Sequence, residues 1–311
     1  MPLNFDKVCA LAIDRTMFDR RLYTQAVDNG VDVRLSTRVV GLRRNGNEIE
    51  IKAISGGREH LFKTPLLIGA DGVNSLTARF INIPRPEIKV RAFAAEVEMP
   101  NEETGSVKLF LGRSISPGWF GWIIPLDEKQ SRVGVGVFDN SAGPLHCFKM
   151  LIERYPELFK DMKIKKTTGG IIPVGLPQRV YGDNVMVVGD VACQTKPISG
   201  GGLYFGLLSA GHCASVAVES LKQNNFTGER LSAYQVLWEK NPGKEIIKGL
   251  SYRKMFNSFS DRQTESIFRS LNQPFVRSLA VRYGHIDSPS DLIGKVLGRG
   301  FDLASPGSII G

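Results

Sequence analysis

The sequence of 311 residues is poor in the residues from which most active sites without a cofactor are built. It has four cysteines, Cys9, Cys147, Cys193 and Cys213, and no two of them form a Cys-x-x-Cys pair. Its four histidines show no metal-ligand spacing, and no Ser-His-Asp arrangement or pair of carboxylates stands out. We therefore expect no metal, no disulfide framework, a reducing compartment such as the cytoplasm, and chemistry that depends on a cofactor.

Long apolar runs are also missing. No charged stretch leads into an apolar core near the N-terminus, so the sequence predicts no signal peptide. The least polar long segment, residues 203–218, is short for a bilayer span and rich in glycine, alanine and serine. Such small residues favour close packing of a helix against a sheet over insertion into a membrane.

The most informative segment is a short apolar run that ends in an acid and leads into a glycine-rich turn. Residues 185–190 read Val-Met-Val-Val-Gly-Asp, and Pro197 and the triplet Gly200, Gly201 and Gly202 follow. This pattern predicts a buried strand, a sharp turn and the start of a long helix. An acid at the end of such a strand can accept hydrogen bonds from ribityl hydroxyls, while glycine amides and a helix N-terminus attract an anion. The segment therefore predicts a dinucleotide or flavin site.

The same segment, which contains Gly189 and Asp190, resembles the second FAD-binding motif of the geranylgeranyl reductase family. That family is part of the larger group of flavoproteins shaped like para-hydroxybenzoate hydroxylase. Residues 66–75, which include Asp71 and Gly72, are similar to the Asp-Gly fingerprint of the same flavoproteins. The resemblance implies that the cofactor is FAD and that these residues bind it, together with the proline and the glycine triplet named above.

A segment near the N-terminus, residues 14–22, reads Asp-Arg-x-x-Phe-Asp-x-x-Leu and resembles a further stretch of the family. There the arginine lies beside FAD, so the resemblance implies that Arg15 contacts the cofactor. In the family this stretch follows a Gly-x-Gly-x-x-Gly fingerprint whose helix holds the FAD pyrophosphate. No such fingerprint occurs before Ala12. We therefore expect a chain that lacks the N-terminal part of its FAD-binding domain.

A further match concerns the substrate. Residues 117–125, Pro-Gly-Trp-Phe-Gly-Trp-Ile-Ile-Pro, resemble the Pro-x-x-Tyr-x-Trp-x-Phe-Pro stretch that lines the isoprenoid cavity of the reductases. The resemblance implies that Trp119, Phe120, Trp122 and Pro125 bind a prenyl chain. Phe120 stands at the family's tyrosine position, and isoleucine replaces the family's last phenylalanine. Without the phenolic hydroxyl we assign no proton donor there, and the catalytic residues stay unknown.

The order of the expected elements gives an α/β (α+β) fold. It consists of a partial FAD-binding Rossmann-like domain, an inserted antiparallel β-sheet that binds substrate, and a C-terminal helical region. We expect this division along the chain: FAD-binding domain, first part, 1–85; β-rich substrate domain, 86–178; FAD-binding domain, second part, 179–225; C-terminal helical region, 226–311.

The periodicity of apolar residues predicts the individual elements. We expect helices at residues 18–27, 76–80 and 145–154. We expect strands at residues 31–35, 39–43, 49–54, 66–68, 92–97, 106–111, 119–125, 132–138 and 169–174. The dipeptide Asn45-Gly46 predicts a hairpin turn between two of these strands.

The last quarter of the chain is basic and amphipathic. From Lys240 to the end it has eleven Lys and Arg against six Asp and Glu, which accounts for more than half of the net charge of +9. Such a surface fits peripheral docking on an anionic membrane, and it fits equally well a solvated basic face over a core helix. No nucleic-acid-binding motif accompanies the charge, so we expect no nucleic acid.

Three functions of different classes agree with these features. The first is an FAD-dependent reductase that saturates geranylgeranyl or other prenyl chains of a lipid or prenyl diphosphate, with ferredoxin or a reduced nicotinamide as electron donor. The second is an FAD-dependent monooxygenase or halogenase on the same scaffold. The third is an inactive fragment, or a component that needs a partner to complete the FAD site. The aromatic stretch favours the reductase.

Overall fold

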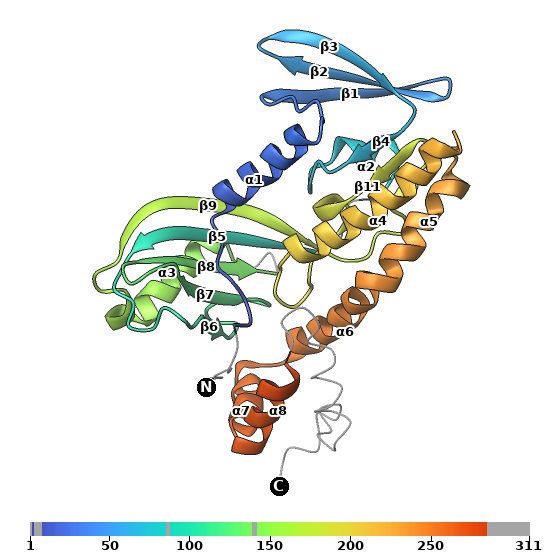
Figure 1. Cartoon of the computed structure of the whole chain (residues 1–311). Coiled ribbons are helices and arrows are strands. Elements are labelled where there is room, and N and C mark those ends of the chain that lie inside the picture. Colours follow the sequence, from blue (N-terminus) through green and yellow to red (C-terminus); the bar gives the residue numbers. More distant parts are fainter. Residues whose placement is uncertain (1, 3–7, 85–87, 139–141, 285–311) are drawn as a thin grey trace.

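The computed structural model describes residue 2 and residues 8–84, 88–138 and 142–284, and confirms a mixed fold of helices and sheets (Figure 1). The smallest sheet has the strand order β10-β11-β4. Its strands are β4 (Leu67–Gly69), β10 (Tyr181–Gly182) and β11 (Val185–Val187). Strand β11 pairs in parallel with β4 although more than one hundred residues separate them. Because parallel strands end at the same edge, the turns that carry Asp71 and Asp190 leave this sheet on the same side.

An antiparallel meander precedes this sheet in the chain. It consists of β1 (Thr37–Asn45), β2 (Glu48–Ser55) and β3 (Arg58–Thr64), in that order. The hairpin at Asn45-Gly46 is confirmed, with Gly46 at φ +61°. The prediction of a strand at residues 31–35 was wrong, because these residues form an irregular segment after helix α1 (Arg15–Asp28). Strand β3 escaped prediction because its sequence is mostly polar and its pairing with β2 holds it in place.

The β-rich region forms a five-stranded antiparallel sheet with the order β6-β7-β8-β5-β9. Its strands are β5 (Ile88–Glu98), β6 (Lys108–Leu111), β7 (Phe120–Pro125), β8 (Gln130–Val137) and β9 (Lys163–Val174). Helix α3 (Pro144–Arg154) covers one face, where its side chains Phe148 and Leu151 are buried against the sheet. The short 3-10 helix η1 (Pro156–Phe159) follows α3. The opposite face of the sheet carries the aromatic residues of β7.

The remaining helices lie at the small sheet or lead from it towards the C-terminal end of the described residues (Figure 1). They are α2 (Leu76–Phe80), η2 (Gly189–Ala192), α4 (Leu203–Lys222), α5 (Gly228–Trp238), η3 (Glu239–Gly243), α6 (Lys244–Ser258), α7 (Asp261–Leu271) and α8 (Pro274–Tyr283). Helix α2 has the bounds that the sequence predicts. No described helix is long and apolar enough to cross a membrane.

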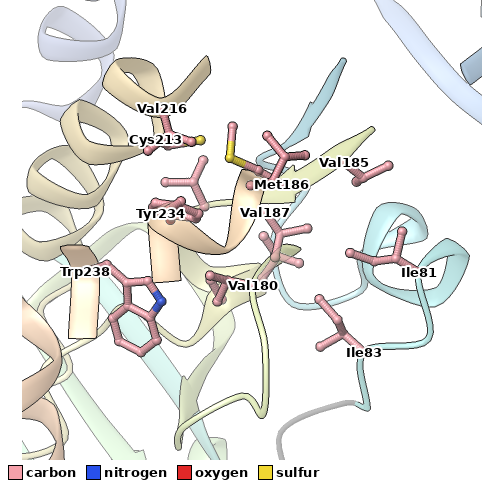
Figure 2. Packing of buried hydrophobic residues seen from close by; sticks show 14 of the residues in the cluster. Ile81, Ile83, Val180, Val185, Met186, Val187, Cys213, Val216, Tyr234 and Trp238 are labelled. Atoms are coloured by element: carbon pink, nitrogen blue, oxygen red, sulfur yellow. The ribbon is translucent and has the colours of Figure 1, made fainter. Parts of the chain in front are cut away.

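The core of the cofactor region lies between the small sheet and helices α4 and α5. Figure 2 shows Val185, Met186 and Val187 of β11 packed among side chains from α4, α5 and the segment after α2. Trp238 and Tyr234 of α5 are fully buried in this cluster. Burial of two large aromatic side chains stabilises the fold by several kcal/mol, roughly 1.5–3 kcal/mol for each side chain. The core therefore fixes the strand from which the Asp190 turn departs.

The C-terminal helices are also attached to the five-stranded sheet. The carboxylate of Asp261, at the start of α7, accepts hydrogen bonds from the backbone amides of Arg113 (2.6 Å) and Ser114 (3.4 Å). The guanidinium of Arg113 donates in turn to the carbonyl of Asn257 in α6 at 2.6 Å. Helices α6 and α7 therefore hold the loop between β6 and β7 from outside the sheet.

Candidate functional site

The Asp190 turn begins where β11 ends, and buried side chains behind it fix its shape. Gly189 has φ +82°, and a Cβ added there would meet no atom within 4 Å. Its amide donates to Oε1 of Gln194 at 2.7 Å, and Nε2 of Gln194 donates to the Tyr234 hydroxyl at 2.8 Å. Gln194 and Tyr234 are both fully buried. Hydrogen bonds therefore hold the buried side of the turn, and the space beside the Cα of Gly189 is open.

The carboxylate of Asp190 lies at the open side of this turn. It has no hydrogen-bond donor among the described residues, and burial raises its pKa, while the positive charge of Arg15 opposes that rise. A Cβ added at Gly202 would lie 3.2 Å from Oδ1 of Asp190, so the acid lies directly beside the start of α4. An unpaired acceptor in such a place fits a ligand hydroxyl, which would supply the missing hydrogen bond.

The glycine loop, residues 197–202, completes this side of the site. Gly200 has φ +76°, and its amide donates to the carbonyl of Lys196 at 2.8 Å, while the Lys196 amide donates to the carbonyl of Gly201 at 3.0 Å. No side chain caps the N-terminus of α4, which begins directly after Gly202. The first amides of the helix and its partial positive charge therefore remain available to an anionic or carbonyl-bearing ligand. These features fit FAD.

The Asp71 turn leaves the neighbouring strand β4 and is built differently. Oδ1 of Asp71 accepts from the Ser75 hydroxyl at 2.6 Å. Oδ2 accepts from the amides of Leu76 (2.7 Å) and Thr77 (3.0 Å) and from the Thr77 hydroxyl (3.2 Å). Burial acts to raise the pKa of Asp71, but the Ser75 hydroxyl and these amides outweigh it and leave the pKa lowered. Asp71 thus anchors the start of α2, and Gly72 (φ +71°) faces open space beside it.

Arg15 and Cys193 lie near the Asp190 turn. Arg15, the first residue of α1, is close enough to Asp190 to influence the pKa of its carboxyl, and it also pairs with Asp19 at 3.2 Å. Cys193 is buried in the left-handed conformation at φ +52°, and burial raises the pKa of its thiol to about 12. A thiol with this pKa is protonated at neutral pH, which argues for a packing role and against a redox role.

The aromatic segment divides between the two faces of the five-stranded sheet. Phe120 and Trp122 are partly exposed on the face opposite α3, and their rings lie 5.9 Å apart. Pro125 is buried and points to the other face, because neighbouring residues of a strand alternate. It lines a hollow there together with Met99 and Asp161. The structure therefore brings Phe120 and Trp122 together and does not bring Pro125 to them.

Trp119 connects this segment to the glycine loop. Its side chain is 4% exposed and stacks on Phe120 with the ring centroids 5.3 Å apart. A Cβ added at Gly200 would lie 3.2 Å from Cζ2 of Trp119, so the indole packs directly against the loop. Trp119 thus lies between the glycine loop and the aromatic face, which is the side of β7 that carries Phe120 and Trp122. Little of its own surface is open to a ligand.

Two glycines of β8 make room for the indoles, and the sequence analysis missed them. A Cβ added at Gly134 would overlap the Trp122 indole, and one at Gly136 would overlap the Trp119 indole. The alternation Gly-Val-Gly in a predicted strand was the available signal, since glycine inside a strand marks close approach of another group. With Ala94 of β5 beside Gly134, these small residues form a shallow apolar floor under Trp122.

Arg253 of α6 is a further residue of this site that no sequence motif indicates. It is 8% exposed, and its guanidinium carbon lies 3.8 Å from the centroid of the Trp119 ring. Its hydrogen bonds reach Pro197 and Ile198 of the glycine loop and Gly118 of the aromatic segment. Only the fold brings a residue of the C-terminal region to this place.

Comparison with known proteins identifies the family of this chain. The FAD binding domain family matches residues 5–219. The digeranylgeranylglycerophospholipid reductase of Methanothrix thermoacetophila is 30% identical over 279 residues, which are 87% of this chain and 70% of that protein. This chain spans 65–70% of the length of eight curated relatives that it matches.

Solved structures share the fold. A geranylgeranyl bacteriochlorophyll reductase-like protein from Thermoplasma acidophilum superposes with a TM-score of 0.81 at 20% identity, covering 93% of this chain and 75% of that one. A flavin-dependent brominase superposes with a TM-score of 0.71 at 16% identity, covering 93% and 76%. The family model matches most of the chain, and a reductase relative is 30% identical to it: the chain belongs to the geranylgeranyl reductase family of FAD-dependent oxidoreductases.

Proposed function

We propose that this chain acts as an FAD-dependent reductase that saturates double bonds in the prenyl chains of a lipid or a prenyl diphosphate. The observation that carries the proposal is the packing of Trp119 against Gly200. This contact joins the loop that would hold the cofactor to the strand that would hold the substrate. The reductase relatives support the same choice of substrate class.

The residues around the Asp190 turn would bind and orient the cofactor. The Asp190 carboxylate would accept hydrogen bonds from ribityl hydroxyls, and the amides at the start of α4 would face the ring edge that carries negative charge on reduction. Gly189, Gly200, Gly201 and Gly202 would let the cofactor approach the backbone. Arg15, Asp71 with Gly72, and Pro197 would shape the same site from its edges. Bound and reduced FAD would supply the hydride for an isolated double bond.

The face of Phe120 and Trp122 would hold the prenyl chain. Both side chains are apolar and partly exposed, and Gly134 and Ala94 keep the surface beside Trp122 low. An extended isoprenoid needs such a surface to exclude water and to fix which double bond lies near the cofactor. Trp119 would align this face with the glycine loop, and Pro125 would support the strand from its other side.

We further propose that ferredoxin or a reduced nicotinamide supplies the electrons and that the C-terminal helices touch an anionic membrane. Lys244, Ile247 and Lys254 of α6 are exposed and, spaced three and seven residues apart, lie on one side of the helix, which supports a basic contact surface that includes an apolar residue. Sedimentation with anionic and with neutral vesicles tests the membrane contact. Equal recovery with both kinds of vesicle would contradict it.

The first test of the function is the visible spectrum of the purified chain after incubation with FAD and desalting. We expect a retained flavin band. We expect Asp190→Asn to raise the dissociation constant about tenfold, because a neutral acceptor replaces a charged one. Asp161→Asn, which alters an exposed acid beyond α3, should leave it unchanged. A colourless wild-type protein would overturn the proposal in favour of an inactive fragment or a component that needs a partner.

The second test is anaerobic turnover of a geranylgeranyl lipid with chemically reduced flavin, followed by mass spectrometry. Gain of two hydrogen atoms per saturated bond is the expected result. A monooxygenase or halogenase, the reaction class of the brominase that shares the fold, would instead consume oxygen when substrate is added. Substrate-stimulated oxygen uptake without saturation would favour that alternative.

A further inference from the structure

Arg253 is a buried cation that joins three segments far apart in the sequence. Buried arginines without a paired acid are rare because desolvation of the charge is costly. Within the described residues its guanidinium makes three hydrogen bonds, and each goes to a main-chain carbonyl: Nε to Pro197 at 3.0 Å, Nη1 to Gly118 at 3.2 Å, and Nη2 to Ile198. Desolvation lowers the pKa of Arg253 to about 10, so the group still carries its charge at neutral pH.

The partners of Arg253 belong to both halves of the site. Pro197 and Ile198 lie three and two residues before the first glycine of the triplet, and Gly118 lies directly before Trp119. The guanidinium also stacks on the Trp119 indole, 3.8 Å from its centroid, and that indole packs against Gly200. Arg253, the Trp119 indole and the glycine loop therefore each contact the other two.

Helix α6 lies close enough to the glycine loop for Arg253 to reach it. Gly249 lies one turn before Arg253, and a Cβ there would lie 3.1 Å from Cδ of Pro197, so the helix backbone rests on the loop. The planar guanidinium has five donors in a fixed arrangement and stacks on aromatic rings, whereas a lysine ammonium is a flexible point charge. Arginine can therefore donate to three carbonyls and stack on the indole at the same time.

We propose that Arg253 is a positioning residue that fixes the glycine loop and Trp119 relative to each other. Docking of α6 thereby sets the geometry in which the loop receives the cofactor and the aromatic face is aligned with it. The proposal rests on the proposed function for the identity of the cofactor, and its structural part stands on the contacts alone.

The experiment compares Arg253→Met, Arg253→Lys and the control Ile246→Val, which trims a fully buried side chain of the same helix that belongs to the core cluster beside β11. The first measurement is hydrogen–deuterium exchange without cofactor at the amides of Lys196 and Gly200, whose hydrogen bonds lie within the loop segment. We expect exchange at least about tenfold faster in Arg253→Met, an intermediate change in Arg253→Lys and none in Ile246→Val. The Met99 amide, which is bonded to Lys129 at the far end of the sheet, serves as the internal reference.

The second measurement is the FAD dissociation constant of the same variants. We expect it to rise about 10- to 100-fold in Arg253→Met, the range for loss of one or two charge-assisted hydrogen bonds, and to stay unchanged in Ile246→Val. Unchanged exchange at Lys196 and Gly200 in Arg253→Met, or equal effects of Ile246→Val, would overturn the proposal. A wild-type chain that binds no FAD would refute the proposed function, while the exchange data would still decide the role of Arg253.

Discussion

The Asp71 turn and the Asp190 turn follow two parallel strands that lie side by side, and each places an acid and a glycine at the same sheet edge. The carboxylate of Asp71 accepts four hydrogen bonds from its own loop, and its pKa is lowered. The carboxylate of Asp190 has no donor among the described residues, and its pKa is raised. Two similar sequence motifs therefore differ in whether their acid is already satisfied by the protein.

This difference separates a structural acid from a binding acid. A carboxylate with all its hydrogen bonds made stabilises the fold and has little left to offer a ligand, whereas an unpaired and partly desolvated carboxylate is kept at a cost in stability. Such groups gather at functional sites. We therefore expect changes at the Asp71 turn to act mainly on folding and changes at the Asp190 turn to act mainly on binding.

Glycines of the Asp71 turn and of the glycine loop give the largest expected effect and test whether the loop is the more tightly packed of the two. Gly72 and Gly200 both have positive φ, but a Cβ at Gly72 meets open space while one at Gly200 would lie 3.0 Å from Ile172 and 3.2 Å from Trp119. Valine at either position is strained by about 1–2 kcal/mol. At Gly200 overpacking adds about 1–3 kcal/mol.

Urea unfolding of Gly72→Val and Gly200→Val measures this difference directly. We expect Gly200→Val to lose about 2–5 kcal/mol of unfolding free energy and Gly72→Val about 1–2 kcal/mol. Equal losses in the two variants would mean that Trp119 does not pack on the loop as the structure has it.

Removal of the two acids gives the next largest effect. Asp71→Ala deletes the acceptor of two backbone amides and two hydroxyls, so we expect a loss of about 1–2 kcal/mol and a lower melting temperature. Asp190→Ala removes a carboxylate that has no described donor, so we expect no loss of stability. Calorimetry of both variants decides the point, and a destabilised Asp190→Ala would show that the acid holds the turn together.

The sequence was sufficient to predict the local features of this molecule. The Asn45-Gly46 hairpin, helix α2 and the strand before Asp190 each follow from short-range signals such as turn residues and runs of apolar residues. Both motifs implied FAD, and the family match confirms that cofactor. These predictions succeeded because a few neighbouring residues carry the whole signal.

What the sequence could not predict depends on contacts between distant segments. Nothing in the motif distinguishes Asp71 from Asp190, because the difference arises from Ser75 and Thr77 on one side and open space on the other. The opposite orientation of Pro125 could have been read from strand alternation, but the burial of Trp119 and the role of Arg253 could not. Both require the position of α6 relative to the glycine loop.

The pH dependence of stability is the smallest expected effect. It nevertheless separates the two acids most clearly, because its sign differs between Asp71 and Asp190. The pKa of Asp71 is lowered below the ordinary value of 3.8, so its contribution to stability is present above that value and is lost as the pH falls through the lowered pKa. The pKa of Asp190 is raised, so its contribution is full below 3.8 and is lost as the pH rises through the raised pKa.

Unfolding curves of Asp71→Asn, Asp190→Asn and the wild type between about pH 7 and about pH 3 test these signs. At neutral pH we expect Asp71→Asn to be less stable than the wild type and Asp190→Asn to be slightly more stable, by some tenths of a kcal/mol in each case because both acids are partly solvated. The Asp190→Asn difference should vanish first as the pH falls, since the raised pKa of Asp190 is reached before the lowered pKa of Asp71. Differences of the same sign in both variants would show that the two turns hold their acids alike, and the distinction between a structural and a binding acid would then have to be abandoned.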